Sequence, residues 1–330
     1  MLGLDDLQAR AELWNGVISQ VHAFFQSKKY IEVRTPVLVK CPGMEPNLDP
    51  VGVDVRLLDG TKHRGGLITS PEYSMKKLLG GGLEKIYTIT PVFRNFEKLG
   101  ERWSVEFSML EWYQQHADYH ECMKETEGLV SMILGRKSDP SPSLGMEKSW
   151  PRISYVKEFE KFFGVHPADA TLENLGEACI RLGIEISKGY NVALIIADLF
   201  QYHIQPRLEA ENPLFFLTEY PVAEAALAQK NADGRSAQRF EGYVNGLEIC
   251  NGFTELVDPV EQRKRFELEA EERRMAGKEV FPIDEELLSR LSSVASPSFG
   301  NALGIDRLIM LKAGAKDIDS IHLFPPSQRF

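Results

Sequence analysis

Acidic side chains recur beside aromatic ones in several short stretches of this 330-residue chain. If residues 105–115 form a strand, the side chains of Phe107, Glu111 and Tyr113 lie on one face of it. A carboxylate between aromatic rings is suited to binding a cationic group in a partly dry pocket. The alternative interpretation is a half-exposed edge strand whose glutamate is simply solvated.

A second pair of carboxylates lies near the dipeptide Asn245-Gly246. This dipeptide favours a type I′ turn, so RFEGYVNGLEICNGFTEL is predicted to form a β-hairpin. In that register Tyr243 faces Glu248, and Glu241 is the diagonal neighbour on the same face. The two glutamates could hold Mg²⁺ against nucleotide phosphates, or they could belong to a solvated face of the sheet.

Three residues of the second hairpin strand, Asn251, Phe253 and Glu255, have the strand parity opposite to that of the preceding glutamate. They can line the same pocket as that glutamate only if a β-bulge interrupts the strand. We predict this bulge at residues 250–252, where a glycine accommodates irregular backbone.

The segment GNALGIDRLIML, residues 300–311, has the glycines of a phosphate-binding loop followed by a helix. Their spacing matches neither the dinucleotide pattern G-x-G-x-x-G nor the P-loop pattern G-x-x-x-x-G-K-[ST]. Ala302 stands between Gly300 and Gly304, and Arg307 follows in the apolar part. The segment is therefore predicted to be a strand and a helix that carries an arginine.

Apolar periodicity near the N-terminus predicts the helix that would support these groups. Its stripe consists of Leu13, Val17, Val21 and Phe24. Periodicity leaves open whether the stripe belongs to the core or to a dimer interface.

Strand-like and helical segments alternate along the rest of the chain. YIEVRTPVL is a predicted strand broken by a proline, VGVDVRLLDGTKHRGGLIT a hairpin, and PEYSMKKLL a short helix that begins at Pro71. EKIYTITPVFRN and PLFFLTEYP are predicted strands, and EAEERRMAGKE is predicted to be a solvated helix. Residues 139–152 predict a connector, and residues 153–211 are mainly helical.

Composition restricts the class of protein. A hydrophobic fraction of 43% and a net charge of -10 predict a folded, soluble protein without a basic surface for nucleic acid. The four cysteines are widely spaced, which suggests neither a zinc ribbon nor a disulfide framework. The N-terminus has no secretion signal, and no apolar run is long enough to span a membrane. We therefore expect a cytoplasmic protein that does not bind membranes.

The order of the motifs resembles that of a known enzyme class. A helix followed by EVRTP, then VFRN with EFSMLEWY, then GLEICNGFTELVDP and GNALGIDRLIML, is similar to the signature motifs of class II aminoacyl-tRNA synthetases. TSPEYSMKKLL and QRKRFE resemble the lysyl-tRNA synthetase branch. The first motif begins close to Met1, leaving no segment for an anticodon-binding OB-fold domain, and Ala302 stands where the synthetases have a glycine. The chain thus resembles the elongation factor P (R)-β-lysine ligases, truncated relatives of lysyl-tRNA synthetase.

This resemblance implies an α+β fold, with a class II synthetase-like antiparallel β-sheet flanked by helices. Residues 1–330 would form a single catalytic domain, in which residues 139–211 are a connector and a helical insertion. The implied reaction activates lysine or (R)-β-lysine with ATP and Mg²⁺, and transfers it to a lysine side chain of elongation factor P. A homodimer is also implied, whereas the acidic net charge gives no support for tRNA binding.

The resemblance also implies roles for individual residues. Arg94 and Arg307 would be catalytic, Arg94 at the α-phosphate, and Phe107 would stack on adenine. Glu241 and Glu248 would hold Mg²⁺. The implied ATP-binding residues are Arg94, Asn95, Phe96, Ser104, Phe107, Glu248, Ile249, Gly304 and Arg307. The implied substrate-binding residues are Ser70, Pro71, Glu72, Glu111, Tyr113, Asn251, Phe253, Glu255 and Ala302.

The loop between Arg94 and Phe107 departs from the family's usual sequence. Members have Arg-Asn-Glu and then His-Asn-Pro-Glu-Phe, whereas this chain has Arg-Asn-Phe and then Trp-Ser-Val-Glu-Phe, with one more residue between the arginine and the last phenylalanine. Trp103 cannot donate to a phosphate as histidine would, although Glu97 could replace the missing glutamate. Three functions stay open: a protein ligase, a stand-alone synthetase that charges tRNA or another amine, and an inert sensor of amino acid or nucleotide.

Overall fold

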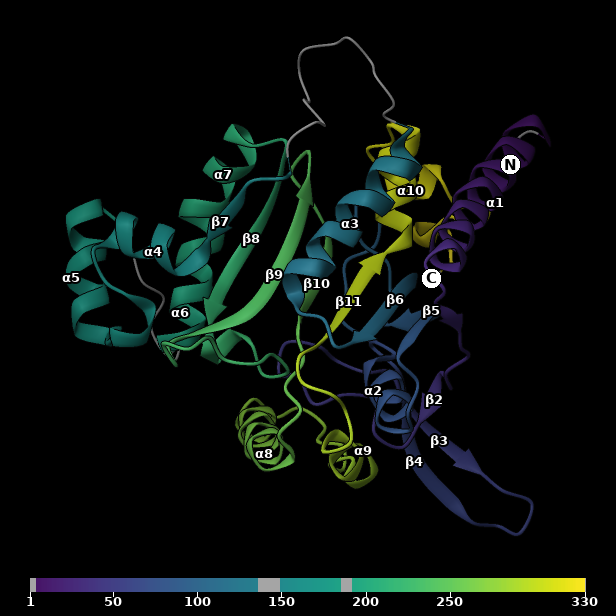
Figure 1. Cartoon of the computed structure of the whole chain (residues 1–330), viewed down its shortest axis with the longest axis horizontal. Helices are drawn as coiled ribbons and strands as arrows, with labels where there is room; N and C mark the ends of the chain where they lie inside the picture. Colours follow the sequence, from purple (N-terminus) through teal and green to yellow (C-terminus); the bar gives the residue numbers. More distant parts are fainter. Residues whose placement is uncertain (1–3, 136–148, 185–191, 330) are drawn as a thin grey trace.

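A large, mainly antiparallel sheet forms the centre of the molecule (Figure 1). The computed structural model describes residues 4–135, 149–184 and 192–329. Within them the sheet has eight strands, and only its two edge pairs, β1 with β5 and β7 with β8, are parallel. The order across the sheet is β1 (Ile31–Glu32), β5 (Lys85–Phe93), β6 (Glu106–Gln115), β11 (Ser298–Gly304), β10 (Leu247–Thr254), β9 (Ser236–Val244), β8 (Leu214–Pro221) and β7 (Arg152–Ser154). This confirms the predicted α+β fold.

Three helices cover one face of this sheet and form its main core. They are α1 (Leu4–Ser27), α3 (Tyr119–Leu134) and α10 (Ile305–Ala313). The predicted stripe of α1 lies in that core, since Val17, Val21 and Phe24 are buried and Leu13 packs at its margin. Three of the four residues of the stripe therefore belong to the core of the protein.

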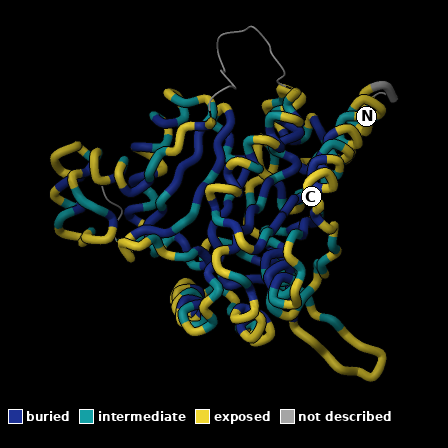
Figure 2. Tube along the Cα trace, in the orientation of Figure 1, coloured by how far each residue is buried: buried dark blue, intermediate teal, exposed yellow. Residues whose placement is uncertain are grey.

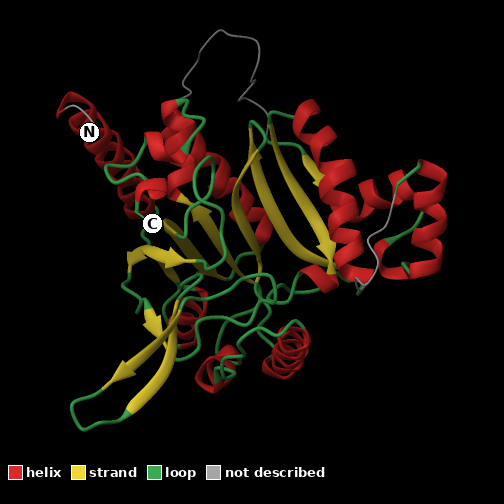
Figure 3. Ribbon diagram, turned by 180° about the vertical axis from the view of Figure 1, so that it is seen from behind, coloured by secondary structure: helices red, strands yellow, loops and turns green. Residues whose placement is uncertain are grey.

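The opposite face carries the short helix α2 (Glu72–Gly80), which packs on β6 and against α9 (Glu285–Leu291), itself beside α8 (Pro259–Met275). Figure 3 shows the sheet from the side opposite to that of Figure 1. A second, three-stranded sheet follows the order β2 (Leu38–Val39), β4 (Lys62–Leu67) and β3 (Gly52–Arg56), which confirms the predicted hairpin. The tip of this hairpin is exposed, whereas the central strands are buried (Figure 2).

A helical insertion packs on the β8 side of the sheet around its own core. The segment that precedes it, predicted as a connector at residues 139–152, lies mostly outside the described residues. The helical insertion consists of α4 (Tyr155–Phe163), α5 (Leu172–Leu182), α6 (Val192–Leu199), the π-helix η2 (Phe200–Ile204) and α7 (Gln205–Glu211). The short 3-10 turns are η1 (Pro167–Asp169), η3 (Val222–Glu224), η4 (Ile318–Ser320) and η5 (Pro326–Gln328). No helix in the described ranges is both long and apolar enough to cross a membrane.

The hairpin of β9 and β10 has the turn that its sequence predicts. Asn245 and Gly246 have φ angles of 51° and 71°, both in the left-handed region that a type I′ turn requires. Glu248 pairs with Tyr243 across the strands. The predicted register is therefore confirmed.

The predicted bulge in β10 exists, but it lies at Ile249 and not at residues 250–252. The pairing with β9 shifts by one residue between Glu248 and Cys250, and is regular again from there onward. The shift gives Asn251 the same facing as Glu248, as the site requires.

The bulge thus borders the predicted segment near Cys250 to Gly252, but Gly252 itself is not part of it. This glycine pairs regularly with Phe240. A Cβ at this glycine would lie 2.8 Å from the Phe240 ring and 2.8 Å from Oδ1 of Asn301. Glycine is thus needed here for packing and not for irregular backbone.

Helix α8 also corrects the sequence interpretation, which took its C-terminal part as solvated. Arg273 is 1% exposed. Its guanidinium donates to the carbonyl oxygens of Glu45, Leu48 and Glu279 at 2.8, 2.6 and 2.8 Å, and to the Asp49 carboxylate at 3.2 Å. One buried side chain therefore fixes the loop that runs past residues 45–49.

We expect Arg273→Met to lower the free energy of unfolding by about 3 kcal/mol, because four acceptors lose a buried charged donor. The matched control is Arg274→Met, since Arg274 is exposed and pairs only with Glu271 one turn earlier. That control should change stability by no more than about 0.5 kcal/mol. Urea unfolding measures both variants, and equal effects would contradict the assigned role of Arg273.

Candidate active site

The face of the sheet that carries α2 presents two rows of cross-strand partners. Directly opposed residues of antiparallel strands share a face, so each row is contiguous across the sheet. The first row is Glu111 of β6, Ala302 of β11, Asn251 of β10 and Glu241 of β9. The methyl group of Ala302 therefore lies between a carboxylate and an amide.

The second row is Tyr113, Gly300, Phe253 and Arg239. A Cβ at Gly300 would lie 2.3 Å from the Tyr113 ring and 2.2 Å from Oε1 of Glu255. Glycine at this position lets the ring and that carboxylate approach the strand closely. The structure thus brings together most of the substrate-binding residues implied by the sequence.

Glu111 is completely buried, which excludes the alternative of a solvated glutamate on an edge strand. Ser70 Oγ donates to its Oε1 at 2.5 Å, and the Tyr113 hydroxyl donates to its Oε2 at 2.9 Å. Burial, and then the nearby charge of Glu72, raise the pKa of Glu111 to about 8. The adjacent Pro71 is buried directly before the first residue of α2.

Lys76 is a residue of this pocket that the sequence interpretation missed. Its ammonium lies 2.5 Å from Glu72 Oε1, 2.6 Å from Glu255 Oε2 and 5.4 Å from the centroid of the Phe253 ring. Burial raises the pKa of Glu255 to about 8, against the opposing effect of Lys76. The sequence could have indicated this ion pair, because Glu72 and Lys76 are four residues apart on a predicted helix. Two buried carboxylates thus share one ammonium of the protein, and the buried carboxylate of Glu111 lies on the same face without an ion pair to Lys76, an arrangement suited to a cationic ligand.

An anion-binding group stands at the end of β5. The guanidinium of Arg94 lies 5.1 Å from the centroid of the Phe107 ring. Its Nε is buried and has no hydrogen-bond partner among the described residues. Burial lowers the pKa of Arg94, and the charges of Glu248 and Glu97 oppose that effect. Glu97 is therefore close enough to stand in for the glutamate that the family has one residue earlier.

Arg307 lies at the start of α10 on the same side. It donates to the carbonyl oxygen of Glu248 at 2.7 Å, and its guanidinium lies 4.9 Å from the centroid of the Trp103 ring. The tryptophan that replaces the family's histidine thus supports an arginine by stacking. A Cβ at Gly304 would meet nothing closer than Arg307 Cδ at 3.7 Å, so the protein's own packing does not require glycine there.

Four of the implied ATP-binding residues are not aimed at this site by their side chains. Phe96 is 86% exposed with a φ of 58°, and Asn95 Oδ1 accepts from its N–H. Ser104 donates its hydroxyl to the carbonyl of Glu106 at 2.6 Å, within the loop. The side chain of Ile249 is buried in the core on the far face. Their main-chain atoms are therefore the groups that these four residues can offer a nucleotide.

Glu241 and Glu248 are neighbours on the site face. Glu241 accepts from Arg239 at 2.6 Å and from the Tyr243 hydroxyl at 2.7 Å. Burial and the charge of Glu241 raise the pKa of Glu248. No group of three His, Cys, Asp or Glu side chains in the described part of the chain could hold a metal alone. Two adjacent carboxylates fit Mg²⁺ when phosphate oxygens supply further ligands.

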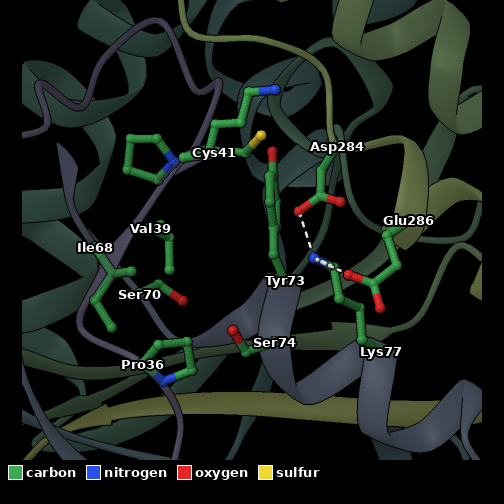
Figure 4. Close-up of a pocket in the computed structure, with 12 residues that line it drawn as sticks. Pro36, Val39, Cys41, Ile68, Ser70, Tyr73, Ser74, Lys77, Asp284 and Glu286 are labelled. Carbon is green, nitrogen blue, oxygen red and sulfur yellow. Dashed lines mark ion pairs between the residues drawn. The ribbon is translucent and has the colours of Figure 1, made fainter. Parts of the chain in front are cut away.

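A separate cavity of about 250 Å³ lies on the other side of α2. Ser70 and Tyr73 line it together with Cys41, and Lys77 points to Asp284 at 2.7 Å (Figure 4). Ser70 is the one implied substrate residue that reaches it. Because Ser70 also donates to Glu111, this cavity borders the pocket around Lys76.

The raised pKa of Glu111 predicts how stability changes with pH in the absence of ligand. The folded protein keeps a proton on Glu111 up to about pH 8, whereas the unfolded chain releases it near pH 4.5. The free energy of unfolding should therefore fall as pH rises across that window, by up to about 1.4 kcal/mol per pH unit for this group. Glu111→Gln should flatten the fall. Urea unfolding at several pH values measures both proteins, and an equal dependence of stability on pH in the wild type and in Glu111→Gln would contradict this prediction.

Comparison with known proteins agrees with the site. The family model for class II tRNA synthetases (D, K and N) matches residues 3–328. Elongation factor P–(R)-β-lysine ligase of Haemophilus influenzae (strain PittGG) is 34% identical over 331 residues, covering 98% of each chain. The proteins of the same name from Salmonella dublin and Avibacterium paragallinarum are each 33% identical, covering 93% of this chain and 92% of their own. The chain belongs to the class II tRNA synthetases and, within them, to the elongation factor P–(R)-β-lysine ligase family.

Proposed function

We propose that the chain activates a lysine-type amino acid with ATP and transfers it to an amine of elongation factor P. One observation carries this proposal: a pocket of buried carboxylates lies on the same sheet face as the buried Nε of Arg94, which has no hydrogen-bond partner among the described residues. The carboxylates suit ammonium groups, and the guanidinium suits a phosphate. The names of the relatives support the choice of amino acid and acceptor.

The reaction would take place in two steps. In the first, an oxygen of the substrate carboxylate attacks the α-phosphorus of ATP, and the bond to pyrophosphate breaks. Arg94 would stabilise the negative charge that develops on the α-phosphate, and Glu241 and Glu248 would hold Mg²⁺, which supplies further positive charge. In the second step, a neutral amine attacks the carbonyl carbon of the adenylate, AMP leaves, and the amine loses a proton.

Substrate orientation follows from where the charges lie. The carboxylate of the amino acid must be near Arg94, so its terminal ammonium extends along the face towards Glu111 and Glu255. Both carboxylates are almost fully buried, where a paired charge is worth more than in water. Phe253 and Tyr113 enclose the aliphatic part.

A homodimer that forms beside the first motif is part of this proposal. Ile31 of β1, at the edge of the large sheet, and Leu38 of β2, at the edge of the small sheet, are 55% and 42% exposed, so apolar surface is free beside the first motif. The function also implies a cytoplasmic protein. A tRNA-charging activity stays the second candidate, and the net charge of -10 weighs against it.

Pyrophosphate exchange into ATP tests the activation step. We expect exchange that depends on lysine or (R)-β-lysine, and a loss of about 100-fold or more in kcat/KM for Arg94→Ala. Arg94→Lys should restore little of the exchange activity, since an ammonium cannot reproduce a planar, stacked guanidinium. Arg102→Ala is the matched control in the same loop, because the side chain of Arg102 is exposed and donates to the carbonyl of Gly246. If no amino acid supports exchange, the chain is a sensor and the proposal fails.

The position of Ala302 between Glu111 and Asn251 predicts a change in substrate preference. Ala302→Gly removes a methyl group from the pocket wall, and the ratio of exchange rates should shift towards α-lysine. The shift should be about 10-fold, the effect expected of one small apolar group. An unchanged ratio would remove this residue from the determinants of selectivity.

A further inference from the structure

A loop not included among the implied site residues runs beside the pocket. Its backbone is held from two sides: Arg273 donates to the carbonyls of Glu45 and Leu48, and the N–H of Asn95 donates to the carbonyl of Asp49 at 2.7 Å. These bonds use the main chain of Glu45 and leave its carboxylate for other contacts. The loop is therefore a fixed wall between α8 and the residue that follows Arg94 in the sequence.

The carboxylate of Glu45 is turned back towards its own loop, at Gly43 and Met44. Its Oε2 accepts from the N–H of Met44 at 3.1 Å. A Cβ at Gly43 would lie 2.7 Å from that oxygen and 3.1 Å from Oγ1 of Thr69, the residue before Ser70. Gly43 has a φ of 151°, and its lack of a side chain leaves room for both the carboxylate and the Thr69 hydroxyl.

Glu45 lies between the two halves of the site, because its loop is bonded to Asn95, the residue after Arg94, and its carboxylate is on the side of Gly43 that also meets Thr69. Burial, and then the charge of Glu72, raise its pKa, whereas Arg94 on the phosphate side lowers it. Glu72 already has Lys76 at 2.5 Å. Glu45 has no ion-pair partner within 4.0 Å among the residues that the structure describes. A second cationic group of a ligand would therefore be stabilised beside Glu45.

Substrate chemistry indicates which cationic group that is. In α-lysine and β-lysine, one ammonium is carried on the first or second carbon from the reacting carboxylate, and the other is at the far end. The carboxylate must be near Arg94, and the far ammonium extends towards Glu111. Resting on the proposed function, we propose that Glu45 is a specificity-determining residue that binds the ammonium group next to the reacting carboxylate.

Equilibrium binding separates this role from a structural one. Calorimetry would compare lysine, (R)-β-lysine and 6-aminohexanoate, which keeps the terminal ammonium but lacks the other. For Glu45→Gln, the Kd of the two lysines should rise about 10- to 100-fold, the effect of losing one hydrogen bond between charged groups. The Kd of 6-aminohexanoate should stay within about twofold, since it has no group for Glu45. Glu267→Gln, on the exposed surface of α8, is the control and should bind all three as the wild type does.

A second variant keeps the test decisive if binding of 6-aminohexanoate is too weak to measure. Glu45→Asp retains the charge and should retain more lysine affinity than Glu45→Gln. The inference is overturned if the two variants lose equal affinity for lysine, if Glu45→Gln loses none, or if it loses as much for 6-aminohexanoate. Wild-type protein that binds none of the three compounds overturns the proposed function instead.

Discussion

Two buried carboxylates, Glu72 and Glu255, share the ammonium of Lys76, and the rest of the site is built around that arrangement. Taking charges out of water costs several kcal/mol per ion, and one ammonium offsets only part of the cost for several carboxylates. Burial therefore raises the pKa of Glu111 and of Glu255 to about 8. A ligand with ammonium groups offsets the excess negative charge of these carboxylates, and this stabilises the bound state. The electrostatics of the pocket therefore favour a substrate with ammonium groups.

The sheet makes this arrangement possible because β6, β11 and β10 lie in its interior, covered on the far face by α1, α3 and α10. Cross-strand pairing fixes Glu111, Ala302 and Asn251 in one row, so a methyl group lies within the polar lining. The bulge at Ile249 then changes the facing of β10 by one residue. Without it, Glu248 and Asn251 would point to opposite faces, and the proposed phosphate and amino-acid sites would not be continuous.

Local rules were sufficient for much of this to be predicted from the sequence. Asn245-Gly246 determines its own turn, and the turn determines that Glu248 lies opposite Tyr243. The facing of Glu111 and Tyr113 follows from strand alternation, and the motif order indicates the fold.

Other features depend on tertiary packing and have no local signal. The bulge lies at Ile249, whereas Gly252 is in a regular pair where the ring of Phe240 leaves no room for a side chain. Arg273 is buried because a loop distant in sequence presents carbonyl groups to it. Phe96 is exposed and Trp103 stacks on Arg307, although the motif alone would place their positions at the nucleotide. The roles of the site residues in catalysis stay predictions.

The most direct measurement uses purified elongation factor P and total tRNA in one reaction with this protein, ATP, Mg²⁺ and labelled (R)-β-lysine. Intact mass and label then show which acceptor is modified. We expect elongation factor P to gain the mass of one β-lysyl group, with no label on tRNA. Label on tRNA with elongation factor P unchanged in mass would contradict a protein-modifying ligase.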